Sequence, residues 1–112
     1  MAKFLLLGRY TVEGVKALLK EGGSKRRVAV TAMLEGVGGK VEGFYYAFGG
    51  SPAVTIVDVP DNVTAAAVTF AINAAGMASV ETIPLITAEE VDQATKVSVP
   101  YRAPGWTSAG RP

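Results

Sequence analysis

A chain of 112 residues with 49% apolar positions is large enough for one compact domain and too small for two. It contains no cysteine and no histidine, which excludes disulfides, thiolate metal sites, a thiol nucleophile and the usual general base at neutral pH. The formal net charge of only +1 argues against a nucleic-acid partner, and no apolar stretch is long enough to span a bilayer, so we expect a cytoplasmic protein without a membrane partner. We also expect no metal site, because Cys and His are missing, and no cofactor.

The first half of the sequence predicts a strand, two helices and a second strand. An apolar run at 4–10 is typical of a strand, and apolar residues recur at helical spacing over 11–21. Gly22 begins a glycine pair that interrupts this pattern before a second helix over 24–37, which Ser24 can cap. Aromatic and β-branched residues at 40–48 predict the next strand.

The second half predicts a hairpin and then two more helices around one more strand. A glycine-rich turn at 49–52 leads into a strand over 53–59. The remaining elements are an Ala-rich helix from 61 to about 75, a strand over 79–86, a short helix that a capping box begins at 87, and a Pro/Gly-rich tail. Pro84 cannot donate to a strand ladder, so we expect the strand that contains it at an edge of the sheet.

This order of elements is that of a split βαβ arrangement. We therefore expect an α+β, ferredoxin-like fold: a four-stranded antiparallel sheet with helices on one face. Residues 1–97 are expected to form this domain and residues 98–112 an extended C-terminal tail.

Both faces of the predicted sheet are apolar, although helices can cover only one of them. In two strands apolar side chains alternate onto opposite faces, Phe4 and Leu6 against Leu5 and Leu7, and Val54 and Ile56 against Val57 and Val59. We expect a second copy of the chain to cover the remaining face, in a homodimer or higher homo-oligomer. The alternative is that the segment 101–106, which contains Tyr101 and Trp106, folds back over its own sheet.

Several short segments, in this order and spacing, resemble the GYD-domain family. They are Leu-Leu-Gly-Arg-Tyr-Thr at 6–11 with Gly14, the pair Arg26 and Arg27, Leu-Glu-Gly-Val-Gly-Gly-Lys at 34–40, Phe-Tyr-Tyr at 44–46, Pro60-Asp61, Gly76 before Glu81-Thr82, and Thr-Ala-Glu-Glu at 87–90. The resemblance covers residues 3 to 96 and implies a dimeric α/β barrel, in which two ferredoxin-like units pack sheet to sheet. It implies no assigned reaction.

The chain departs from this family at the signature turn. Gly-x-Tyr-Asp in the family is Gly-Gly-Ser-Pro at 49–52 here, so Ser51 and Pro52 replace the tyrosine and the aspartate. A role that needs that phenol or that carboxylate is not expected of this chain.

The candidate ligand-binding residues come from the aromatic strand and its neighbours. Phe44, Tyr46 and Phe48 alternate onto one face of the strand, either as core packing or as the wall of a cavity between subunits. On neighbouring strands we expect Tyr10, Asp58 and Glu81 to lie on the same face as these aromatic residues. Arg9 would join them if the first strand presents its opposite set of side chains to this face. The full set predicted to bind a small, largely apolar molecule is Arg9, Tyr10, Phe44, Tyr46, Phe48 and Ile56.

An enzyme without a cofactor is the alternative function. Asp58 and Glu81, both predicted within strands, are the candidate bases, because carboxylates near apolar walls can act as bases. Either would transfer protons with Tyr46 or Tyr10 as donor; the simpler interpretation is that Asp58 ends its strand and Glu81 faces water.

Two further interpretations remain. A regulatory module that senses a small effector is one, although no segment is expected to form an appended DNA-binding unit. The run Lys25-Arg26-Arg27 is interpreted as a solvated surface patch, with an anion site at the start of its helix as the alternative.

Overall fold

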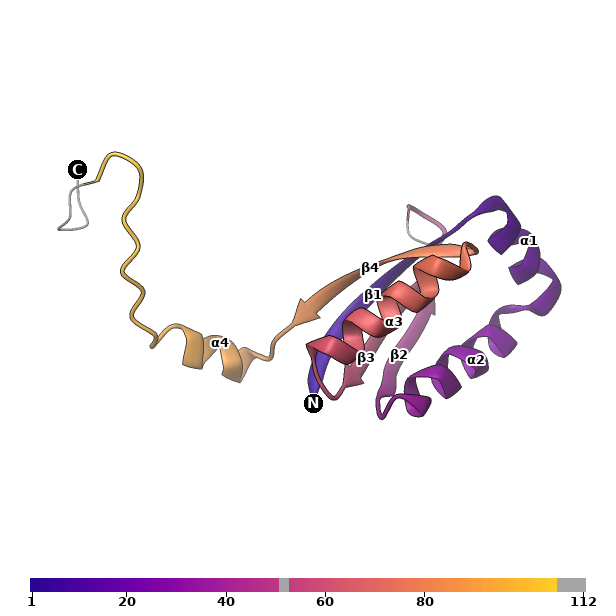
Figure 1. Ribbon diagram of the computed structural model, residues 1–112, viewed down its shortest axis with the longest axis horizontal. Helices are drawn as coiled ribbons and strands as arrows, with labels where there is room; N and C mark the ends of the chain where they lie inside the picture. Colours follow the sequence, from indigo (N-terminus) through magenta and orange to yellow (C-terminus); the bar gives the residue numbers. More distant parts are fainter. Residues whose placement is uncertain (51–52, 107–112) are drawn as a thin grey trace.

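The computed structural model describes residues 1–50 and 53–106 of the chain. Ser51 and Pro52, at which the chain departs from the turn of the family it resembles, lie outside the described part, as does the end of the tail from 107. In chain order the elements are β1 (Ala2–Tyr10), α1 (Val12–Glu21), α2 (Gly23–Gly36), β2 (Lys40–Tyr46), β3 (Ala53–Val59), α3 (Asn62–Ala75), β4 (Ala78–Leu85) and α4 (Ala88–Ala94) (Figure 1).

The four strands form one open antiparallel sheet in the order β2-β3-β1-β4. This is the ferredoxin-like arrangement that the order of elements predicts, with β2 and β3 joined as a hairpin. β4 lies at an edge, so the missing N–H of Pro84 costs no hydrogen bond to a further strand.

Short polar residues begin three of the helices. The Thr11 side chain accepts a hydrogen bond from the Gly14 N–H at α1, and Asp61 accepts one from the Thr64 N–H at α3. Thr87 begins α4 with a full capping box. The predicted cap at Ser24 is wrong: α2 begins one residue earlier, and its N-cap is Gly22, whose positive φ of 86° allows the sharp change of direction after α1.

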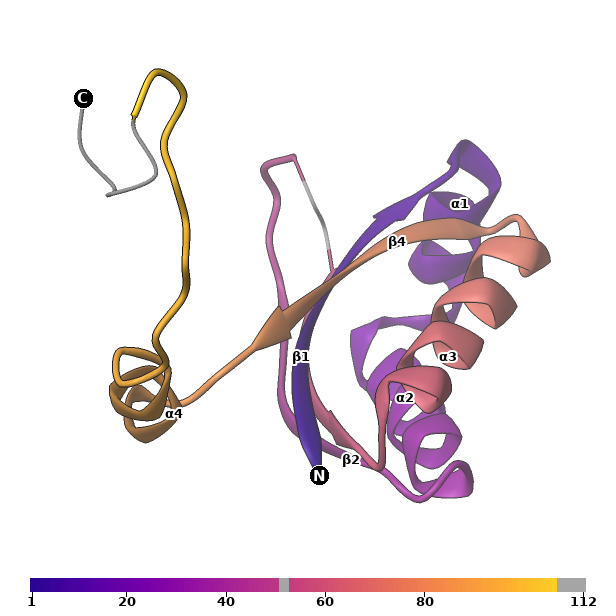
Figure 2. The same cartoon turned by 60° about the vertical axis from the view of Figure 1, so that its left-hand side comes forward.

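α1, α2 and α3 all lie on one side of the sheet (Figure 2). The core forms between that side and the helices, and Leu34 of α2 is its most enclosed side chain, with 0% of its surface exposed. The other buried core residues come from β1, β3 and α3: Phe4, Leu6, Val57, Val59 and Ala65. Alternation along the strands thus sends one apolar set to the helices, as predicted.

The second apolar set lies on the face of the sheet that the helices leave bare. Pairing along β1 places Leu5 opposite Ile56 and Ile83, and Leu7 opposite Val54, all on this face. The bare face also carries an ion-paired group, because Lys3 of β1 pairs with Glu42 and lies 3.1 Å from the Asp58 carboxylate.

The C-terminal arm, residues 86–106, leaves the end of β4 and stands apart from the sheet, on the bare-face side (Figure 2). None of the residues of α4 is buried, and the molecule is 61 Å long against 28 and 23 Å in the other directions. The segment 101–106 therefore does not fold back over its own sheet.

β2 is shorter than the sequence suggests. It ends at Tyr46, which pairs with Ala53, the first residue of β3. Phe48, predicted within the strand, instead lies in the connection to β3 with its side chain fully exposed.

Candidate functional site

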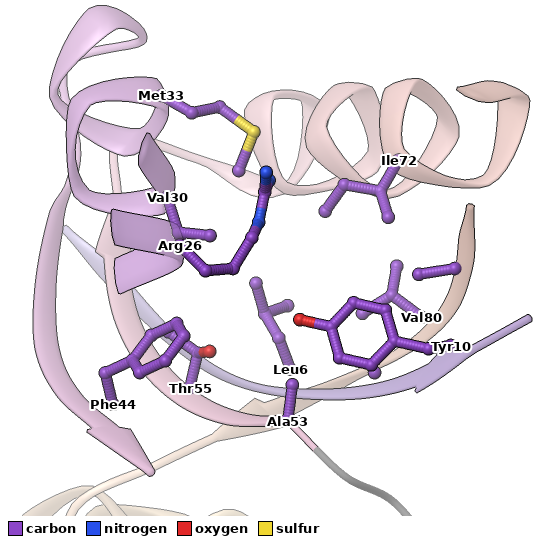
Figure 3. Close-up of a pocket in the computed structure, with 12 residues that line it drawn as sticks. Leu6, Tyr10, Arg26, Val30, Met33, Phe44, Ala53, Thr55, Ile72 and Val80 are labelled. Carbon is purple, nitrogen blue, oxygen red and sulfur yellow. The ribbon is translucent and has the colours of Figure 1, made fainter. Parts of the chain in front are cut away.

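A cavity opens between α2, α3 and the helix-side face of the sheet (Figure 3). It has two adjoining hollows of about 90 and 330 Å³, and the second extends beneath α1. The residues common to both hollows are Tyr10, Arg26, Met33, Ile72 and Ala78. The cavity therefore lies within one subunit, on the helix side of the sheet, and not over the bare face where a cavity between subunits would lie.

Small residues at paired positions of the sheet create the space. Gly8 of β1 pairs with Ala53 of β3, and a Cβ at Gly8 would already lie 3.4 Å from the Ala53 methyl group. Ala78, opposite Tyr10 on β4, is small as well. Longer side chains at these positions would fill the space between sheet and helices, so the cavity follows directly from the sequence at this end of the sheet.

At one end of the larger hollow α1 closely approaches Met77, the residue that precedes β4. Gly14 is buried, and the Met77 carbonyl oxygen lies where a Cβ on Gly14 would point. The same carbonyl accepts hydrogen bonds from the Thr11 N–H at 3.0 Å and the Thr11 hydroxyl at 3.2 Å. Glycine at 14 is thus the residue that lets α1 approach the Met77 backbone this closely.

The cavity wall contains one cation. Arg26 extends from the first turn of α2 into the space between α2 and α3, and the Tyr10 hydroxyl points into the same space (Figure 3). The Arg26 Nη1 atom lies 3.9 Å from Glu21 Oε2, which is too long for a hydrogen bond. Apart from Arg26, the first hollow has mainly apolar walls, which include Leu6, Val30, Met33, Ile72 and Val80.

Tyr46 lies next to this polar end of the cavity. Its hydroxyl donates a hydrogen bond to the Gly23 carbonyl at 3.3 Å, and its ring packs edge-on against Phe44 with centroids 5.3 Å apart. Burial raises the pKa of Tyr46, and the neighbouring Tyr10 raises this pKa further. Tyr46 is therefore a neutral phenol at physiological pH.

The structure divides the predicted site residues between the two faces of the sheet. Tyr10, Phe44 and Tyr46 lie together on the helix side. The bare face carries Arg9, Ile56, Asp58 and Glu81. Phe48 is fully exposed and lies on neither face of the sheet. The prediction that Asp58 and Glu81 lie on the same face as Tyr46 is wrong. Asp58 pairs with Lys3 and Glu81 pairs with Leu7. Both of these β1 residues lie on the face that points away from the helices.

The two candidate bases have other surroundings. Asp58 is buried beside Lys3, and hydrogen bonds to Glu42 and then Asp58 raise the pKa of that lysine. Glu81 is exposed and lines a separate hollow of about 160 Å³ with Arg9. Both carboxylates lie on the face of the sheet opposite to Tyr10 and Tyr46, so the structure does not pair these two candidate bases with the candidate donors.

Arg26 is the site residue that sequence reasoning misplaced. Lys25 and Arg27 are exposed, as expected of a surface patch, but Arg26 is half-buried and faces the cavity. A signal for this existed, since Arg26, Val30 and Met33 are spaced i, i+4 and i+7 and therefore share one face of α2.

Comparison with known proteins gives one match. The model of the family described as the GYD domain matches residues 4–95. No curated protein and no solved structure matches the chain. No helix within residues 1–50 and 53–106 combines the length and apolar character needed to cross a membrane.

Proposed function

The chain belongs to the GYD domain family, and from this starting point we propose that it is a homodimeric binding protein with a small, largely apolar molecule held in the cavity of each subunit. The cavity between α2, α3 and the sheet is the observation that supports binding. Its larger hollow, about 330 Å³, is within the size range of small-molecule sites, and apolar walls with a few polar groups are typical of them.

Blocking the cavity tests this proposal. Ala71 of α3 lines the larger hollow, whereas Ala67, one turn earlier on the same helix, is exposed and does not line it. The probe is N-phenyl-1-naphthylamine, a neutral apolar dye whose fluorescence rises on binding. We expect Ala71→Phe to weaken dye binding at least about tenfold, as for loss of a well-packed apolar group, and Ala67→Phe to leave it unchanged. Equal binding to all three proteins, or none to the wild type, would contradict the proposal.

A second copy of the chain is the proposed cover for the bare face. Apolar side chains from three adjacent strands meet there: Leu5 and Leu7 of β1, Val54 and Ile56 of β3, and Ile83 and Leu85 of β4. Sheet-to-sheet packing of two copies would bury them in a dimeric α/β barrel, and two-fold homodimers are the commonest oligomers.

The C-terminal arm supports the same assembly. It projects on the bare-face side with Val97, Val99 and Tyr101 at least 64% exposed. An arm that carries apolar side chains beyond its own domain is suited to pack against a second copy. Deletion of the residues after Val99 should then weaken the dimer or lower its melting temperature.

Sedimentation velocity over a dilution series tests the dimer. Ile56→Lys places a charge in the middle of the bare face, and Val28→Lys places the same charge on the exposed surface of α2. We expect a dimer for the wild type and Val28→Lys, and a folded monomer for Ile56→Lys. A wild-type protein that is monomeric at every concentration would overturn this part of the proposal.

A further inference from the structure

Arg26 places a positive charge against an otherwise apolar cavity. Its side chain is half-buried and lines both hollows, and Figure 3 shows it directed into the space above Leu6 that the Tyr10 hydroxyl also faces. A cation at an apolar wall loses hydration, and that loss is offset only when an acceptor takes up its N–H groups.

Glu21 lies near Arg26 but is too far away to accept a hydrogen bond from its guanidinium. Its Oε2 atom is 3.9 Å from Nη1 of Arg26, and the carboxylate sits at the α1 side of the cavity, where it lines only the larger hollow. A guanidinium has five N–H donors in a planar fork. Donors of Arg26 therefore remain for a group that enters from the cavity.

The neighbouring Tyr10 phenol also favours an acceptor. Tyr10 turns its hydroxyl into the cavity, whereas the Tyr46 hydroxyl already donates its proton to the Gly23 carbonyl. A neutral phenol donates a hydrogen bond readily to an anion, so the cation and the Tyr10 hydroxyl favour the same kind of partner.

We infer that the molecule bound in this cavity is a monoanionic organic acid, with its apolar body between α2 and α3 and its carboxylate on Arg26 and the Tyr10 hydroxyl. This inference rests on the binding function proposed above. A carboxylate matches the guanidinium fork in a two-bond geometry. A phosphate dianion matches less well, because Arg26 is the only cation among the lining residues and Glu21 lies beside it.

Matched pairs of probes test the inference in the intact protein. Phenylacetate and indole-3-acetate are compared with their neutral amides, phenylacetamide and indole-3-acetamide, by displacement of the neutral dye. Bonds to a charged group favour binding by about tenfold or more, so each acid should displace the dye at roughly a tenth of the concentration its amide requires. In Arg26→Gln this preference should fall to about one, when each displacement is referred to that variant's own affinity for the dye. Arg27→Gln, at the exposed neighbour, should keep the preference.

The outcomes separate the two proposals. If the wild type binds no dye, the binding function fails. If the wild type binds dye but acids and amides displace the dye equally, the binding function is supported and the acidic ligand is refuted. The same conclusion holds if Arg26→Gln keeps the preference for acids. The wild-type comparison needs no variant, so the inference remains testable even if Arg26→Gln does not fold.

Discussion

Replacing Gly14 with alanine should push α1 away from the Met77 backbone and disturb this end of the cavity. An alanine Cβ would overlap the Met77 carbonyl oxygen and would lie 3.1 Å from both the Met77 carbonyl carbon and the Tyr10 ring. The obstacle is backbone held by hydrogen bonds from Thr11, so it cannot rotate away as a flexible side chain would. The first turn of α1 must move instead.

The expected cost follows from this geometry. Overpacking of a tight contact costs about 1–3 kcal/mol, and a weakened hydrogen bond to Met77 adds about 1 kcal/mol. Alanine's better helix preference returns about 0.5–1 kcal/mol. The free energy of unfolding should therefore fall by about 1–3.5 kcal/mol, which lowers the melting temperature by roughly 5–20 °C for a domain of this size. Dye binding should weaken as well, because Gly14, Tyr10 and Met77 line the larger hollow.

Urea denaturation and dye titration measure these two effects, with Gly36→Ala as the control. Gly36 is the last residue of α2, and a Cβ there would meet nothing within 4 Å. This substitution should stabilise the protein by about 0.5–1 kcal/mol. A Gly14→Ala protein as stable as the wild type, with undiminished dye binding, would refute the close-approach argument.

Two further predictions concern the core and the start of α3. Leu34→Ala should lower the free energy of unfolding by about 2–5 kcal/mol in urea denaturation. The control, Leu19→Ala on the exposed side of α1, should change it by less than about 0.5 kcal/mol. Equal effects of the two substitutions would mean that Leu34 is not in a packed core. The hydrogen bond from the Thr64 backbone N–H lowers the pKa of Asp61 in the folded state. The charged Asp61 side chain therefore stabilises the fold at pH values above the pKa that Asp61 has in the unfolded chain. This stabilisation is lost as the pH falls through the folded-state pKa, below about pH 4. Thermal melts against pH should show this loss in the wild type and a smaller loss in Asp61→Asn, which keeps a capping oxygen but no charge; identical pH profiles would contradict the assignment.

The contrast between Asp61 and Arg26 shows where local sequence information ends. Asp61 caps its helix through a residue three positions away, so spacing alone predicts the contact. Arg26 sits in a run of three cations of identical chemistry, and only the packing of α2 on the sheet decides that this one faces the cavity.

Caps, glycine breaks and side-chain alternation act over a few residues. The order of the elements, the two apolar faces of the sheet and the edge position of Pro84 could therefore be predicted from the sequence. The placement of Tyr10, Phe44 and Tyr46 on the helix side, and of Asp58 and Glu81 on the other, could not. Residues from distant strands share a face only through their pairing, and a shift of one residue in register would move each of them to the opposite face.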